Sequence, residues 1–542
     1  MSLSQRRLLM LLAVFPLGLA VPVLADELAA PMVSLPAAAS ATDAALALPA
    51  AATTVDATDG VLKINGAARA TASRTSAYGV DPNGARSSDA LQGSSRATLQ
   101  IDFDTGRRLG DWGAQAALAF DAVSGTYAGA PTLEGDKIPG ARFEPFLPTQ
   151  AWAGLSLRDL GTLRVGLMNS HWGLGLLAND GNHALDSRRD DWFVLPTTGD
   201  RVARAQLVMQ PFGRTLTAAR GLFVAFSVDQ VIEDATAIRA QGDTAVQEVA
   251  AVRWHFAKER WAGIYYVHRD QTFHNTSGPF LKVNVLDAAF DMDYRKAGSG
   301  LRVQGEGAVI LGRTDLAPTP DHPEHDVRQS AAVAKARYDW ADKGLRFELD
   351  GGWFSGDDNL EDGALTGFKA NPNFQQGILL FSQVLGWQSG RARVTASNPQ
   401  VSGYPSADLD RLATGGAVTS AITAFPKVGW KATSFLEIYG GALLAFSPTA
   451  PIDAFSTRIG GGTPRNYLGK APNGSLLGTE FDLGAVATMA SNAWPFTLAL
   501  RAEYALLLPG GVQTGMEADS PVHGGRLSLS IARTPAAVKE AK

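Results

Sequence analysis

The stretch ATLQIDFDTGRRLGDWGAQAALAF, residues 97–120, decides the fold of this chain. Apolar side chains occupy every second position from Ala97 to Phe103 and again from Trp112 to Phe120, and polar or small residues fill the positions between them. Successive side chains of a β-strand point to opposite faces, so each segment predicts a strand with one apolar face. The stretch therefore predicts two antiparallel strands joined by a tight turn.

The same alternation recurs along the chain, for example at 332–340 and 496–504. Short and long connections between the alternating segments take turns. The short ones are 105–110, 158–161, 211–221, 257–260, 295–300, 341–344, 431–434 and 491–495. The long ones lie near 75–95, 124–148, 170–201, 230–244, 269–280, 313–328, 355–414, 448–475 and 509–522. This plan predicts an all-β fold, a single antiparallel transmembrane β-barrel of about 18 strands, with short periplasmic turns, long extracellular loops and both chain ends in the periplasm.

The N-terminus has the features of a secretory signal peptide. Arg6 and Arg7 precede a short apolar run, and Val23-Leu24-Ala25 supplies the small residues that a signal peptidase requires. We therefore expect export and an outer-membrane location. The predicted organisation is a signal peptide at 1–25 cleaved after Ala25, an Ala/Pro-rich flexible periplasmic leader at 26–59, the barrel at 60–533 and a C-terminal tail at 534–542.

Composition and motifs narrow the function further. The chain has no cysteine and a net charge of −5, which excludes thiolate metal sites and gives no sign of a nucleic-acid partner. It lacks the G-x-S-x-G, H-E-x-x-H and P-loop motifs, so we expect no enzymatic activity and no cofactor. Two clusters of metal-ligand residue types, 321–326 and 357–363, are interpreted as solvated outer loops without a metal, with loose calcium binding at the second as the alternative.

If the apolar faces point to lipid, charged side chains of both signs line the lumen. Charges at this density need water or each other, because bare burial costs several kcal/mol per ion. A barrel of 16–18 strands is wide enough for an aqueous channel. The predicted pore-lining residues are Lys63, Arg69, Asp102, Arg164, Arg204, Arg253, Arg302, Glu306, Lys335, Arg337, Arg346, Glu348, Glu437, Glu480, Asp482, Arg501 and Glu503. The alternative is a plugged barrel whose interior ion pairs brace the wall.

Aromatic residues mark two further features. Tryptophans beside short turns predict a girdle at the membrane interface, formed by Trp112, Trp254, Trp261, Trp340, Trp430 and Trp494. The largest outer loop, 355–414, is more apolar than a free loop, and we expect it to fold inward as a constriction that includes Phe374, Phe381 and Trp387. A short helix is expected around Ser406–Leu412. The alternative is that 376–396 adds two strands, for about 20 in total.

Several short motifs resemble those of alginate-export-type, porin-like outer-membrane barrels. Residues 351–359, GGWFSGDDN, resemble the strand end that carries SGD in that family, and 477–483, LGTEFDL, resemble its LG-x-E-x-D strand. Residues 161–167 and 172–175 resemble the glycine-punctuated strand of porin-like barrels. The resemblance implies an 18-stranded barrel that passively admits an anionic polysaccharide or a small polar solute.

Together these features predict a porin-like outer-membrane channel for a hydrophilic solute or polysaccharide. The expected partners are outer-membrane lipid and the solute, with periplasmic or envelope proteins as further candidates. The alternative function is a non-conducting structural barrel that scaffolds an envelope protein complex.

Overall fold

The computed structural model describes residues 61–105, 112–128, 144–157, 161–181, 191–195, 197–212, 221–257, 259–274, 278–359, 361–397, 408–449, 453–490, 496–516 and 520–533. The expected signal peptide, leader and C-terminal tail lie outside these residues. No helix in the described ranges is long and apolar enough to cross a membrane.

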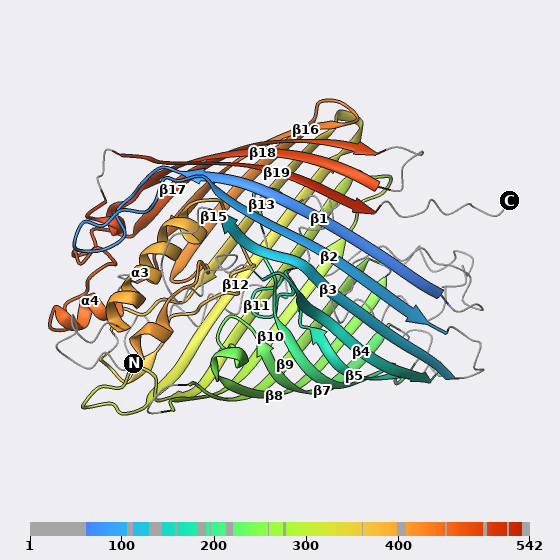
Figure 1. Ribbon diagram of the computed structural model, residues 1–542, viewed down its shortest axis with the longest axis horizontal. Coiled ribbons are helices and arrows are strands. Elements are labelled where there is room, and N and C mark those ends of the chain that lie inside the picture. Colours follow the sequence, from blue (N-terminus) through green and yellow to red (C-terminus); the bar gives the residue numbers. More distant parts are fainter. Residues whose placement is uncertain are drawn as a thin grey trace, which may run out of the picture. The chain divides into compact units, whose positions relative to one another are not determined.

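The described chain forms one closed antiparallel sheet. Its 19 strands include β14 (Ala364–Leu365), a short segment that pairs in parallel with one end of β12, so the wall itself contains 19 − 1 = 18 strands. The last wall strand pairs with the first and closes the barrel (Figure 1). The wall strands are β1 (Val61–Thr75), β2 (Gln92–Asp104), β3 (Trp112–Ala128), β4 (Leu147–Leu157), β5 (Gly161–Asn169), β6 (Arg201–Met209), β7 (Leu222–Glu233), β8 (Thr244–Ala257), β9 (Arg260–Thr272), β10 (Phe280–Asp293), β11 (Gly300–Thr314), β12 (His325–Trp340), β13 (Leu345–Phe354), β15 (Ala421–Lys431), β16 (Leu436–Phe446), β17 (Leu476–Ala490), β18 (Phe496–Pro509) and β19 (Val522–Arg533).

Short and long connections lie at opposite ends of the barrel, as the sequence predicts. We call these the turn end and the loop end. The start of β1 and the end of β19 both lie at the turn end, since the two strands are antiparallel and Ala67 faces Ala532. The predicted fold, an antiparallel barrel of about 18 strands, is confirmed.

Alternation within each strand separates an apolar exterior from a mixed interior. In β15 the outward residues include Ile422, Val428 and Trp430, whereas Thr423 and Lys427 point inward and are buried. The exterior exposes leucine, isoleucine, valine and aromatic side chains on strands all around the barrel. Contact of these apolar side chains with water is unfavourable, whereas contact with the hydrocarbon of a membrane is favourable.

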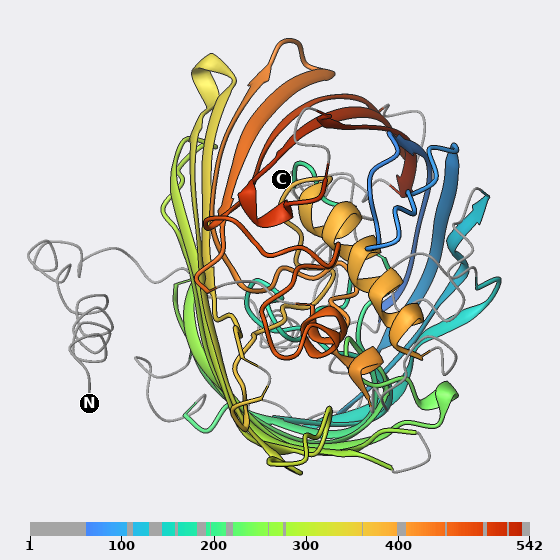
Figure 2. The ribbon, with the colours of Figure 1, turned by 90° about the vertical axis from the view of Figure 1, so that its left-hand side faces the viewer.

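Helices occur inside the barrel and at its ends. The alternative that 376–396 adds two wall strands is wrong, because this segment is helical. The segment 376–396 contains a π-helical turn, η6 (Leu380–Leu385), which continues into α3 (Gly386–Ser397). The short helix expected around Ser406–Leu412 is η7 (Leu409–Leu412). Figure 2 shows α3 lying within the ring of strands. The remaining helices are α4 (Ala454–Ile459), η4 (Arg239–Gln241), η5 (Ala341–Lys343) and η8 (Gly511–Gln513).

The tryptophans predicted to form the interface girdle differ in the face of the wall that they occupy. Trp112, Trp254, Trp340 and Trp430 are exposed on the outer face near the turn end, and Trp494 lies outside the described residues. Trp261 corrects the prediction, because it points into the lumen.

The register of β8 and β9 explains the exception. Trp254 pairs with Ala262, which places Trp261 opposite the inward-facing His255. The Arg253 guanidinium lies 3.6 Å from the centre of the Trp261 ring, a cation–π contact inside the barrel. Two tryptophans near one turn therefore occupy opposite faces of the wall.

Candidate functional site: the barrel lumen

Strand register places all the charged residues predicted to line the pore on the inner face of the wall. Lys63 lies opposite Asp102, and Lys335 lies opposite Asp350. On neighbouring strands, Glu348 lies opposite both Arg337 and Lys427. The inner wall therefore carries acids and bases side by side, which allows direct pairing across strands.

Many of these charges pair with each other. Asp339 accepts from Arg337 at 2.7 Å and from Arg295 at 2.9 Å, close to the turn end. Lys427 donates to Glu348 and Asp350 at 2.9 and 2.7 Å. The predicted residues Arg204, Arg302, Arg346, Arg501, Glu437 and Glu503 also take part in ion pairs. Some of these pairs join neighbouring strands, such as Lys427 of β15 with Glu348 of β13.

Two long loops enter the lumen from the loop end. One follows β5, and the other follows β13 and is described at residues 355–359, 361–397 and 408–420. Asn371 joins them, since its backbone N–H donates to the Leu176 carbonyl at 2.7 Å and its side-chain amide donates to Asp200 at 3.0 Å. The Thr197 N–H donates to Asn373 at 2.9 Å. We call the second loop the inserted loop; it lies across the barrel, supported by the first.

Carboxylates of the wall hold both loops by their backbones. Glu480 accepts hydrogen bonds from the N–H groups of Ile378, Leu379 and Leu380, the last two at 2.8 Å. Glu306 accepts from the N–H groups of Leu174 and Leu176 in the other loop. Buried donors must find acceptors, and a carboxylate that accepts several bonds satisfies many at once.

This arrangement corrects part of the predicted pore lining. Glu306 and Glu480 face inward but are almost completely buried beneath the loops that they hold. Glu503 is covered in the same way, because it accepts a hydrogen bond from the Phe193 N–H at 3.1 Å. The three glutamates are therefore loop anchors rather than water-facing residues. Sequence alternation gives the face of a side chain but not what covers it.

Aromatic side chains fill the lumen beside these anchors. Trp192 stacks on Tyr439 of β16 with ring centres 5.2 Å apart, and Phe193 packs edge-on against the same ring. Gly429 of β15 makes room for the indole, because a Cβ atom at that position would lie 2.2 Å from Trp192. The aromatic pair therefore depends on one glycine of the wall.

The predicted constriction residues lie in the inserted loop. Phe381 and Trp387 are buried in the apolar cluster inside the barrel, and Phe374 packs against Phe354 with ring centres 6.2 Å apart. The loop is apolar because it packs on the wall. Sequence reasoning missed Trp192 and Phe193, although the run WFVL at 192–195 is the same kind of apolar signal in a long polar loop.

Two cavities flank the inserted loop. The larger, about 380 Å³, lies against β8–β12, and its wall includes Val267, Val283, Val285, Ile310 and Val327. We call it the valine cavity. The smaller, about 140 Å³, lies against β1, β2 and β19 and contains Arg69, Arg96 and Arg526. We call it the arginine cavity. The inserted loop lines both, with Lys369, Leu385 and Ser389 in the valine cavity and Gln375, Ser382 and Trp387 in the arginine cavity.

The two clusters considered for metals have other contacts. In the first, the His325 ring lies 3.1 Å from the Ala317 carbonyl. In the second, the Asp357 carboxylate accepts from the N–H groups of Asn359 and Thr366 at 3.1 and 2.9 Å. Among the residues that the structure describes, no three His, Cys, Asp or Glu side chains form a group that could hold a metal ion.

Comparison with known proteins gives only remote structural likenesses. No family model matches the chain, and no curated protein matches it. Among solved structures, it is similar to OccK9 (OpdG) of Pseudomonas aeruginosa, with 12% identity and a TM-score of 0.46, covering 87% of this chain and 98% of the other. It is also similar to OccAB2 of Acinetobacter baumannii, with 11% identity and a TM-score of 0.46, covering 87% of this chain and 97% of the other. The outer membrane channel DcaP of the same species has 10% identity and a TM-score of 0.40, with 88% of this chain and 97% of the other covered.

Proposed function

We propose that this chain is a passive outer-membrane channel for small hydrophilic solutes. The observation that carries the proposal is the closed 18-strand wall, apolar outside and charged inside. In a closed barrel the strands pair with each other all the way round, which satisfies the backbone groups of the wall without water, and the apolar exterior suits lipid. Barrels of this width hold aqueous channels.

The arginine cavity is the favoured part of the solute path. Beside its three arginines it is lined by small hydroxyl side chains, including Thr71, Ser73 and Ser94. Hydroxyl and guanidinium groups replace the hydrogen bonds that a hydrated solute gives up on entering a narrow space. Arg96 is paired with Asp121 at 2.8 Å, so the local field is moderate rather than strongly positive.

A small solute fits this lumen better than a polysaccharide does. The resemblance to alginate-export-type barrels implies either, but the inserted loop is held by hydrogen bonds to Glu480, by the ring contact of Phe374 and by the burial of Trp387 in the apolar cluster. A polymer chain would have to displace the loop, whereas a small solute passes beside it.

Planar-bilayer recording tests the proposal. We expect single-channel steps from the purified protein, and larger steps when residues 355–414 are replaced by a short Gly-Ser linker. Circular dichroism checks that the shortened protein keeps its β-structure. If both proteins insert and neither conducts, the channel is wrong and the scaffold function takes its place.

A further inference from the structure

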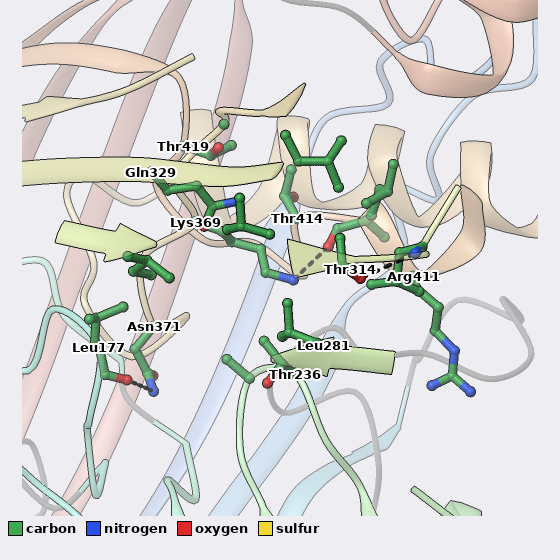
Figure 3. Close-up of a pocket in the computed structure, with 18 of the residues that line it drawn as sticks. Leu177, Thr236, Leu281, Thr314, Gln329, Lys369, Asn371, Arg411, Thr414 and Thr419 are labelled. Atoms are coloured by element: carbon green, nitrogen blue, oxygen red, sulfur yellow. Dashed lines mark hydrogen bonds between the residues drawn. The ribbon is translucent and has the colours of Figure 1, made fainter. Parts of the chain in front are cut away.

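Charged side chains gather on the outer face of the wall at the loop end of β9–β12. Three cations with side chains more than half exposed lie there on adjacent strands, namely Lys282 of β10, Arg313 of β11 and Arg328 of β12. Their chain neighbours point inward and line the valine cavity, namely Leu281, Thr314 and Gln329 (Figure 3). Because successive side chains of a strand alternate between its faces, the three cations point outward. We call them the outer basic patch.

Other strands end differently at the loop end. The last outward side chains of four of them are large, apolar and exposed, namely Trp353 of β13, Ile422 of β15, Phe446 of β16 and Leu508 of β18. In contrast, β12 continues past its neighbour, since Ala331 faces Phe354 at the end of β13 and residues 325–330 lie beyond it. The outer basic patch therefore lies beyond the apolar band of the wall, at the height expected for membrane headgroups.

Strand register brings the three cations close together. Lys282 and Arg313 face each other across β10 and β11, and Arg328 is diagonal to Arg313, which faces Asp326. Facing side chains of an antiparallel pair have Cβ atoms about 4.5–5.5 Å apart, and like charges in facing positions are destabilising. An anionic group placed between these side chains contacts all three cations and offsets their repulsion.

Carboxylates lie among these cations. Each cation has one acidic neighbour: Asp270 lies 3.0 Å from Lys282, Glu324 lies 3.7 Å from Arg313, and Asp326 pairs with Arg328. Farther along the same surface, Glu248 of β8 faces His268 of β9. Ion pairs this exposed contribute little to stability, so the cations can exchange their partners for another anion. The carboxylates can share a divalent cation with a phosphate, as is usual for Mg²⁺.

Apolar side chains continue this outer surface toward the turn end. Leu286 follows Lys282 on the same face of β10, and Leu311 precedes Arg313 on the same face of β11. Both leucines are about half exposed, and Leu286 faces the exposed Val309. A molecule with an anionic head and acyl chains would therefore contact the cations and the apolar band at the same time.

We propose that the outer basic patch binds the phosphorylated headgroup of an outer-leaflet lipid, with a phosphate on Lys282, Arg313 and Arg328 and acyl chains along Leu286 and Leu311. Arginine suits this role, because its planar guanidinium donates two parallel hydrogen bonds to a phosphate. The inference goes beyond the channel, and it rests on the proposed outer-membrane location with the loop end outward. The bound lipid fixes the height of this side of the barrel in the membrane.

Native mass spectrometry of the purified full chain in detergent tests the proposal. The probes are lipid A with both phosphates, monophosphoryl lipid A, and diacylglycerol, which has no phosphate. We expect affinity to fall in that order, because each phosphate adds charge-assisted hydrogen bonds. Inorganic phosphate at the same concentration should not displace lipid A, since it lacks acyl chains. Equal binding of the three lipids, or displacement by inorganic phosphate, would overturn the proposal.

Substitutions of the cations test the site itself. The combined variant Lys282→Gln, Arg313→Gln and Arg328→Gln should bind bisphosphorylated lipid A about tenfold more weakly and diacylglycerol unchanged. Arg313→Gln alone should give a smaller loss. Its matched control is Arg74→Gln, which removes one exposed arginine from the loop end of β1 and should leave lipid binding unchanged. Equal losses in the two single variants contradict the site. Circular dichroism checks that every variant keeps its β-structure.

Conductance separates this inference from the channel itself. A protein that conducts in planar bilayers, but binds lipid A equally with and without the combined substitution, contradicts the inference alone. A protein that loses lipid A binding in the combined variant, but never conducts in any form, contradicts the channel and leaves the lipid site in place.

Discussion

The valine cavity and the arginine cavity are both lined by the inserted loop, but the side chains of their walls differ in chemistry. The inserted loop lines both, yet the wall presents valines on β8–β12 and arginines with hydroxyl side chains on β1, β2 and β19. The difference therefore comes from the wall, where each inward position is fixed by strand register. It shows that one barrel can offer a valine-rich surface and an arginine-lined surface beside the same loop.

Detaching the inserted loop from the wall should have the largest effect on the two cavities. In Glu480→Ala, the N–H groups of Ile378, Leu379 and Leu380 lose their acceptor, which costs about 1–3 kcal/mol for each buried donor left unpaired. We expect the loop to detach and the two cavities to merge. Single-channel conductance should rise, and limited proteolysis should cut within 355–420.

Glu480→Gln is the matched control for that variant. It keeps one acceptor oxygen and should therefore give a smaller rise in conductance. If Glu480→Ala conducts like the unaltered protein and resists protease equally, the glutamate does not hold the loop.

Displacing Trp192 should disturb the arginine side more than the valine side. Gly429→Val places side-chain atoms in the space of the indole, at an overpacking cost of about 1–3 kcal/mol. The segment after Trp192 contributes Leu195 and Thr197 to the arginine cavity. We therefore expect an altered single-channel conductance.

Gly66→Ala provides the comparison for this substitution. A Cβ atom there would meet its nearest neighbour at 3.6 Å, an ordinary contact, so conductance should not change. An unchanged conductance in Gly429→Val would mean that the position of Trp192 does not affect the arginine side of the lumen.

Charge removal in the arginine cavity should give a smaller, purely electrostatic effect. Arg96 and Arg526 are paired with Asp121 and Glu503, so Arg69→Gln leaves those pairs intact. The reversal potential in a salt gradient should shift toward cation preference. Arg74→Gln, which removes an exposed arginine paired with Asp89, should shift it less. Equal shifts of the reversal potential in the two variants would mean that the charges responsible for ion selectivity lie outside the arginine cavity.

Sequence reasoning predicted the wall well because a strand has a strict two-residue period. The inward position of Lys63, Lys335 and Glu348 follows from alternation alone. Sequence reasoning placed Trp261 wrongly, because proximity to a turn does not specify whether a side chain points to the inner or the outer face of the wall. It also treated Glu306 and Glu480 as water-facing, because nothing in a strand pattern shows a loop that packs over it.

The long loops explain most of what was not predicted. Trp192, Phe193 and Lys369 have no regular period around them, so their positions depend on contacts with distant strands. Phe193 and Glu503 are 310 positions apart in the chain and meet only because the barrel closes. The apolar content of the inserted loop did indicate that it packs inward. Composition does not indicate which wall residues the loop contacts.

By itself, the sequence determined the antiparallel barrel, the alternation of turns and loops, and the charged inner face, because these depend on local period and connection length. Only the tertiary structure decided which charges the loops cover, where the inserted loop lies, and that the lumen has one apolar and one arginine-lined cavity. Those features depend on hydrogen bonds and packing between segments far apart in the chain, and such contacts leave no periodic trace in the sequence.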